Sequence, residues 1–230
     1  PNAWLTLVEK SLGGRPYEKL ASKSYDGLTI KTLYTADPSA PNTGVTASGA
    51  TQSGWDVRCV SSHPDPSTAN KQILADLEKG AASVWLKLDP TGRTGTVIKS
   101  RGDLETLLDG VFLDLAPVTL DPGGPSLPPA AYLMDLLTRK NIAHEAFTGN
   151  FGADPLSTLA AVGKVIVPME SLLGRMADLA AHTAKTYPNA KALNIATTVY
   201  HSAGCSEAQE LAIAMATAVE YLRHITKAGV

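Results

Sequence analysis

The sequence has few residues of the kinds that staple a fold or hold a metal, since only two cysteines, Cys59 and Cys205, occur among its 230 residues. Their number and spacing exclude a disulfide framework and a cysteine-type metal site. No apolar run approaches the roughly 18 residues needed to cross a bilayer. The first residues, 1–5, also lack the basic start and long apolar stretch of a signal peptide. A reduced, cytoplasmic environment is therefore expected.

Strong charge of either sign is also missing. The net charge is -2, which gives no electrostatic reason to expect nucleic acid or an anionic membrane as a partner. We find no Gly-rich phosphate loop, no Ser-His-Asp order, no zinc-type spacing and no paired-carboxylate signature. What remains is an ordinary globular composition, 44% hydrophobic and 18% charged, in a chain long enough for a sizeable core.

The chain divides into two parts by composition. Residues 36–54 are rich in Pro, Ser, Thr, Gly and Ala and show no hydrophobic period, which predicts a loop or an extended arm. We therefore expect an N-terminal arm at residues 1–54 and a folded domain at residues 55–230.

Within the second part, strand-like runs alternate with helical ones. The expected strands are residues 56–60, 83–88, either 111–115 or 117–121, 143–147 and 195–200. The expected helices are residues 66–79, 100–108, 130–140, 155–162, 172–186 and 206–228. The last helix is the clearest, because Ser206 and Gln209 form a capping-box pattern and Gly229 follows its end. A three-to-four spacing predicts that one face of this helix packs in the core, namely Leu211, Met215, Ala218, Leu222 and Ile225.

Strands separated by helices indicate parallel βαβ units. A doubly wound sheet is possible, but no Gly-rich phosphate loop follows any of the strands, so the (β/α)8 TIM-barrel type is favoured. Only about five units are visible, whereas a barrel needs eight and roughly 250 residues. The sequence therefore predicts an α/β fold with an incomplete barrel and an extended N-terminal arm, and we expect the chain to be a piece of a longer protein.

Tyr200 and His201 are the first candidates for chemistry, because an apolar run places them at the end of a predicted strand, where barrels carry their sites. An imidazole beside a phenol can hydrogen-bond a carbonyl oxygen or move a proton. Isolated histidines at strand ends are, however, more often structural. Both interpretations stay open.

Other polar residues follow the predicted strands, and turn or cap formation is their first interpretation. These are His63, Asp65, Asp89 and Asp121. Gly149 and Gly152 could bring the backbone close to a ligand or serve a tight turn. Cys205 precedes a helix, where a thiol can be activated, but no partner base is evident.

Several segments, in order along the chain, resemble the methylmalonyl-CoA mutase family, and specifically its small subunits. They are residues 25–35 (Tyr-Asp-Gly-Leu-Thr-Ile-Lys-Thr-Leu-Tyr-Thr), 54–58, 63–70, 76–81 and 200–223. The resemblance implies an arm that packs on a partner subunit and a barrel that holds an acyl-CoA in catalytic relatives. It also implies radical chemistry on adenosylcobalamin, which interconverts methylmalonyl-CoA and succinyl-CoA.

Departures from the family pattern imply an eroded site. Catalytic chains read Gly-Thr-Ile-Gln-Asn-Asp where residues 149–154 read Gly-Asn-Phe-Gly-Ala-Asp, so Gly152 stands in place of a substrate-binding Gln. The segment after His201 is two residues shorter, and the Asp-x-His-x-x-Gly cobalamin motif is absent. Tyr200, His201, Gly149 and Gly152 would line a vestigial pocket, with no cofactor or metal held by this chain.

The leading hypothesis is a small, non-catalytic subunit, or a fragment of one, that supports a large subunit carrying adenosylcobalamin. The expected partner is that large subunit in a heterodimer, or a second copy of the chain. A second hypothesis is a stand-alone barrel enzyme that acts on an acyl-CoA or another small carbonyl substrate with His201 in its site. A third is an unrelated barrel lyase or aldolase, although Lys87 lies within its strand rather than after it.

Overall fold

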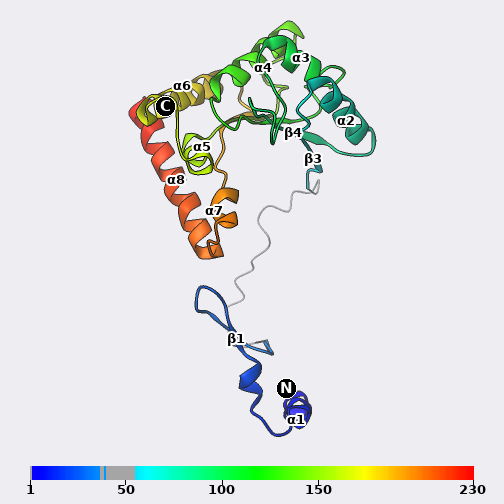
Figure 1. Ribbon diagram of the computed structural model, residues 1–230, viewed down its shortest axis with the longest axis vertical. Coiled ribbons are helices and arrows are strands. Elements are labelled where there is room, and N and C mark those ends of the chain that lie inside the picture. The colour runs from blue at the N-terminus through cyan, green and yellow to red at the C-terminus, as the bar shows by residue number, and fades with distance from the viewer. Residues whose placement is uncertain (1, 37–38, 40–54) are drawn as a thin grey trace.

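The computed structural model describes residues 2–36, 39 and 55–230 (Figure 1). The N-terminal arm consists of α1 (Asn2–Ser11), the short 3-10 helix η1 (Tyr17–Leu20) and a small hairpin of β1 (Ser22–Lys23) and β2 (Thr29–Ile30). No residue of α1 is buried, and α1 lies at the end of the arm farthest from the rest of the chain (Figure 1). The predicted boundary at residues 54 and 55 adjoins the undescribed residues 40–54, so the two-part division stays a prediction.

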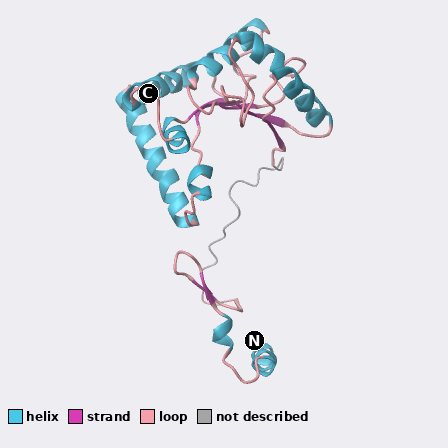
Figure 2. Ribbon diagram, viewed as in Figure 1, coloured by secondary structure: helices cyan, strands magenta, loops and turns pink. Residues whose placement is uncertain are grey.

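Beyond the arm, the described residues form a five-stranded parallel sheet with helices between its strands (Figure 2). The strands are β3 (Arg58–Ser61), β4 (Ser83–Lys87), β5 (Val118–Asp121), β6 (Gly149–Ala153) and β7 (Ala190–Leu193). The helices are α2 (Pro66–Glu78), α3 (Arg101–Leu107), α4 (Leu127–Arg139), α5 (Pro155–Val162), α6 (Met169–Thr186), α7 (Thr198–Ser202) and α8 (Glu207–Lys227). The predicted parallel α/β class is confirmed.

Each strand of the sheet pairs with the strand before it, in the order β3-β4-β5-β6-β7. A doubly wound sheet reverses its strand order at a switch point, and no reversal occurs among these strands. The carboxyl ends of all five strands therefore lie at one edge of the sheet. Loops that follow the strands meet at that edge.

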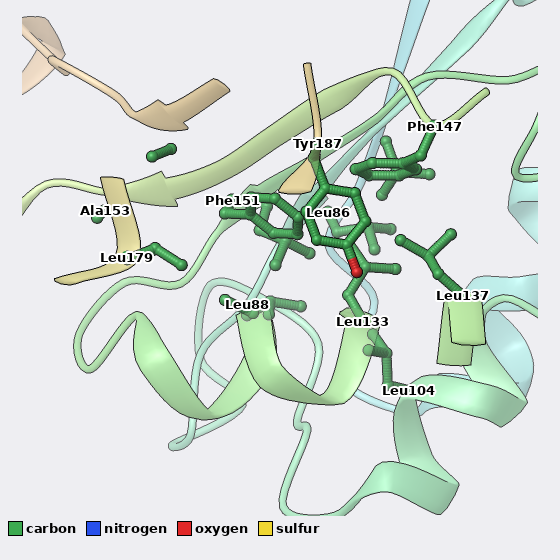
Figure 3. Packing of buried hydrophobic residues seen from close by; sticks show 14 of the residues in the cluster. Leu86, Leu88, Leu104, Leu133, Leu137, Phe147, Phe151, Ala153, Leu179 and Tyr187 are labelled. Atoms are coloured by element: carbon green, nitrogen blue, oxygen red, sulfur yellow. The ribbon is translucent and has the colours of Figure 1, made fainter. Parts of the chain in front are cut away.

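The core lies between the sheet and one layer of helices. In β4 the side chains alternate, with Val84 and Leu86 buried and Trp85 and Lys87 exposed, as expected for a strand with one covered face. Figure 3 shows Leu86 and Leu88 close to Leu133 of α4, under the aromatic rings of Phe147, Phe151 and Tyr187. Ring centroids of Phe151 and Tyr187 lie 5.5 Å apart in an edge-to-face arrangement.

Most of the predicted elements are present within a few residues of their expected bounds. The alternative strand at residues 117–121 is the correct one, since β5 is Val118–Asp121. Two helices begin with a capping box. Ser100 and Asp103 form the one that begins α3, and Ser206 and Gln209 form the one that begins α8. In each box a side-chain oxygen accepts a hydrogen bond from an otherwise unpaired backbone N–H, which fixes where the helix begins.

Two predicted strands are wrong. The segment 143–147 is not a strand. Phe147 is buried with the rings of Phe151 and Tyr187, and pairing with the neighbouring strands begins only at Gly149, in β6. The segment 195–200 is not a strand either: β7 ends at Leu193, and Thr198 begins α7. There the Ala196 N–H donates to the carboxylate of Asp154 instead of a neighbouring strand, which turns the chain out of the sheet.

The predicted buried face of α8 is also wrong in most of its members. Leu211 and Met215 are 61% exposed and Leu222 is 60% exposed, whereas Ile225 is buried. The side chains of α8 that the domain does bury are Thr217, Tyr221 and Ile225. A three-to-four spacing identifies an apolar face, but it does not say which face a neighbouring helix covers. Here α6 contacts α8 from the other side, and the apolar stripe faces outward.

Among the described helices, none combines the length and apolar character needed to cross a membrane.

Candidate functional site

The candidate site lies at the carboxyl edge of the sheet, where β6 and β7 end and α7 follows. Asn150 joins the two strands, because its side-chain amide donates to the Leu193 carbonyl oxygen at 2.8 Å. The same side chain accepts a hydrogen bond from the Gly152 N–H at 2.9 Å. Polar groups of β6 thus hold the end of β7 in place.

Asp154, the residue after β6, connects three parts of this edge. Its carboxylate accepts hydrogen bonds from the Ser157 N–H at 3.3 Å, from the Ala196 N–H at 2.6 Å and from the Tyr221 hydroxyl at 2.5 Å. The residue is buried, with 8% of its surface exposed. Asp154 therefore caps α5, anchors the loop after β7 and fixes α8.

Tyr221 completes this network from α8. Its oxygen also accepts a hydrogen bond from the Leu156 N–H at 3.0 Å. Burial, together with hydrogen bonding to Asp154, raises the pKa of Tyr221 well above its usual range. The phenol stays protonated and remains a donor, so the arrangement is structural rather than acid–base.

His201 lies on α7 rather than at a strand end. Its Nδ1 is 2.9 Å from a carboxylate oxygen of Glu210 on α8, and the Thr197 hydroxyl donates to the other oxygen at 2.5 Å. Hydrogen bonds from Thr197 and His201 lower the pKa of Glu210. Since an ionised carboxylate only accepts, Nδ1 carries the proton. The imidazole therefore presents Nε2, from a side chain that is 68% exposed.

Gly149 and Gly152 are placed by the backbone of β5. A Cβ added to Gly149 would lie 2.1 Å from the Val118 carbonyl oxygen, and one added to Gly152 would lie 1.9 Å from that of Leu120. Gly152 also has a φ of +74°, in the region that favours glycine. Both positions thus serve the close approach of β6 to β5. Their assignment to a vestigial pocket stays a prediction.

A second polar group lies on the sheet face that the helices leave open, and it includes Asp121, a candidate from the sequence that ends β5. Register places Trp85 beside Thr119 and Lys87 beside Asp121. Burial raises the pKa of Asp121, while Lys87 and a hydrogen bond from Trp85 oppose that shift. The carboxylate is held between a cation and an indole N–H.

The remaining predicted candidates serve turns and caps. Asp65 accepts from the Thr68 N–H at 2.8 Å and begins α2, while His63 accepts the Asp65 N–H at 3.1 Å. Burial alone would raise the pKa of Asp89, but hydrogen bonds from Thr91 and Thr94 lower it overall. Cys205 is half-buried. In the described ranges, no three His, Cys, Asp or Glu side chains gather as a metal site.

Two partners of this edge were missed from the sequence, Glu210 and Asp154. An aspartate directly before Pro155 is a recognisable helix start, so Asp154 had a local signal for capping. Nothing in the sequence pairs Glu210 with His201, because the contact joins two different helices.

The fold and this edge define a parallel α/β protein whose polar residues collect where the strands end. The sequence profile of the family described as methylmalonyl-CoA mutase matches residues 23–230. The chain belongs to the methylmalonyl-CoA mutase family.

Curated relatives agree with this assignment. A methylmalonyl-CoA mutase small subunit of Streptomyces virginiae is 37% identical over 98% of the chain. The small subunit of Propionibacterium freudenreichii subsp. shermanii is 30% identical, also over 98% of the chain. A methylmalonyl-CoA mutase of Cereibacter sphaeroides is 25% identical over 96%. The chain spans 38%, 37% and 35% of the lengths of these relatives. The resemblance to small subunits noted in the sequence is confirmed.

Proposed function

We propose that this chain is part of a small, non-catalytic subunit of an adenosylcobalamin-dependent methylmalonyl-CoA mutase. In that role it supports the interconversion of methylmalonyl-CoA and succinyl-CoA by a large subunit. Two small-subunit relatives that align over 98% of the chain support the role by their names.

The environment of Gly152 is the main observation in favour of a subunit that is not catalytic. The family resemblance puts a substrate-contacting Gln of the catalytic chains at this position. In this chain a Cβ there would lie 1.9 Å from the Leu120 carbonyl oxygen, so no side chain fits without moving β6. In this proposal the amide that would bind the acyl group is missing, and the Leu120 carbonyl oxygen lies where a side chain at residue 152 would begin.

The cofactor belongs, in this proposal, to the partner. The resemblance implies that the chain which binds cobalamin supplies an imidazole ligand from an Asp-x-His-x-x-Gly motif. In the described residues, His201 and His224 face Glu210 and Glu220, and His63 accepts a backbone N–H. The other two histidines pack on the ring of Tyr187. None of these five histidines stands in an Asp-x-His-x-x-Gly motif, so the proposal assigns the cobalt ligand to the partner.

The sequential parallel strand order supports a partial (β/α)8 barrel, since each strand of a barrel lies beside its predecessor. A partial barrel leaves apolar helix surface to be covered by further protein, and the outward stripe of α8 fits that need. We propose that a large subunit in a heterodimer, or self-association, completes the structure, in the cytoplasm.

One observation favours the alternative of an enzyme with His201 in its site. The Thr197–Glu210–His201 chain of hydrogen bonds orients an exposed imidazole, as general bases are often oriented. The substrate in that case would be an acyl-CoA or another small carbonyl compound.

Replacing His201 by Ala in the complex with a large subunit separates the two hypotheses. A supporting subunit predicts turnover of methylmalonyl-CoA within about twofold of the unmodified complex, whereas loss of a catalytic base costs about a hundredfold or more. Sedimentation shows whether the complex remains assembled. Abolished turnover in an assembled complex would overturn the non-catalytic proposal. The chain alone, given adenosylcobalamin, is expected to show neither turnover nor a bound chromophore.

A further inference from the structure

A side-chain hydrogen bond joins the N-terminal arm to the α/β domain across 180 residues of sequence. The Ser206 hydroxyl donates to a carboxylate oxygen of Asp26. Asp26 lies in the turn between β1 and β2, and Ser206 is the residue that caps α8. The hairpin turn accordingly lies below the N-terminal end of α8 (Figure 1).

The turn itself does not need the Asp26 carboxylate. Ser24 closes the turn, because its carbonyl oxygen accepts from the Gly27 N–H and its hydroxyl accepts from the Leu28 N–H. Gly27 supplies the positive φ of +80°. An aspartate in a turn commonly bonds to its own backbone. Here that function is filled by Ser24, and the Asp26 carboxylate is left to bond outside the arm.

The Ser206 hydroxyl, in turn, needs an acceptor. Its oxygen accepts the Gln209 N–H at 3.3 Å, which leaves the hydroxyl proton to be placed. Ser206 is 4% exposed, although the three residues that follow are all exposed. A buried hydroxyl donor without a partner is costly. The negative charge of Asp26 also lies at the end of α8 where the helix dipole favours it.

We propose that Asp26 is a latch that holds the arm hairpin against the N-terminal end of α8. The latch places the arm beside the two helices that carry His201 and Glu210. The position of the arm then depends on one carboxylate, and removing it frees the hairpin while the α/β domain keeps its own contacts. This inference concerns the chain itself and does not depend on whether the subunit is catalytic.

Cysteine cross-linking tests the latch. In the protein with Cys59→Ser and Cys205→Ser, Tyr25→Cys beside the latch is combined with Glu207→Cys beside Ser206. Both positions are exposed. The control pair joins Leu7→Cys, in exposed α1, with the same Glu207→Cys. A short bifunctional maleimide is added to dilute protein, and the linked peptide pair is quantified by mass spectrometry.

The first pair is expected to cross-link about tenfold faster than the control, since the latch raises the local concentration of the two thiols. Adding Asp26→Ala should lower its rate to that of the control. Equal rates for the two pairs, or a rate unchanged by Asp26→Ala, would overturn the latch. Circular dichroism of every variant establishes that the comparison is made on folded protein.

A charge variant gives a second test that keeps the helix cap. Ser206→Asp retains a favoured capping residue but sets a second carboxylate against Asp26. The cross-linking rate should fall, and adding Asp26→Asn should restore part of it, because the repulsion is removed. A Ser206→Asp variant that cross-links as fast as the parent would contradict the proposal.

Discussion

The Tyr221 hydroxyl donates a 2.5 Å hydrogen bond to the Asp154 carboxylate, from a position 67 residues further along the chain. This contact ties the last helix to the edge of the sheet where β6 ends, and both residues are buried. The same helix, α8, carries Glu210, which contacts His201 of α7.

Replacing Tyr221 by Phe is therefore expected to destabilise the protein by about 1–3 kcal/mol, because Asp154 loses a donor and the Leu156 N–H loses its acceptor in a buried place. Urea unfolding followed by circular dichroism measures the change. Tyr25→Phe is the matched control: Tyr25 is 79% exposed, and its substitution should change stability by less than about 0.5 kcal/mol. Equal effects of the two substitutions would refute the role given to the buried pair.

Gly152→Ala is expected to destabilise the protein by about 3 kcal/mol or more, since both overpacking against Leu120 and the positive φ oppose a side chain. Gly163 offers a control with nearly the same φ, +72°, and nothing within 4 Å of an added Cβ. Gly163→Ala should cost only about 1 kcal/mol, the conformational part alone. The difference between the two variants, measured by urea unfolding, isolates the steric contact with β5.

The stability contributed by Asp121 depends on pH. Burial raises its folded-state pKa, so the folded protein favours the protonated carboxyl. The favourable contribution is present below the unfolded pKa of about 3.9 and is lost as pH rises through the folded pKa. Asp121→Asn should accordingly become more stable, relative to the parent, between about pH 4 and pH 7. Urea unfolding across that range tests this, with Asp114→Asn as an exposed control. A relative stability that falls with pH would contradict the sign.

The stability contributed by Glu210 depends on pH in the opposite direction, because hydrogen bonds from Thr197 and His201 lower the pKa of Glu210. Its contribution to stability is present above the unfolded pKa of about 4.3 and is lost as pH falls through the folded value. Carboxyl NMR titration should give a pKa below the ordinary range, and both Thr197→Val and His201→Ala should raise it. If neither substitution moves the Glu210 titration, the three side chains do not interact in solution.

How far the sequence predicts this structure depends on whether a signal is local. Ser206 and Gln209 begin α8 as predicted, because a capping box needs only residues that are neighbours in the chain. The segment at residues 195–200 has equally strong local strand character, but the Asp154 carboxylate takes the Ala196 N–H and overrides it. The prediction that Leu211 and Met215 are buried is wrong for a similar reason. Their spacing identifies an apolar face, but it does not determine which neighbouring element covers that face.

The candidate site follows the same rule. His201 could be named as a candidate site residue from the apolar run before it and from the family resemblance. Its partner Glu210 lies on another helix, α8, which the Tyr221 hydroxyl joins to Asp154 at the end of β6. The sequence thus predicts which side chains are available, and tertiary contacts decide which of them meet.

The strand order also bears on how the chain is synthesised. After β3, each strand of the sheet pairs with the strand directly before it along the chain. As the polypeptide leaves the ribosome, the neighbour of every new strand has therefore already emerged. Each parallel pairing still needs a crossover connection, as between the paired residues Arg58 and Ser83, which are 25 residues apart, so a new strand pairs only after the helix before it has been made. The sheet can grow from its first strand during translation, one unit at a time, while the outer edge of β3 and the newest strand both stay unpaired.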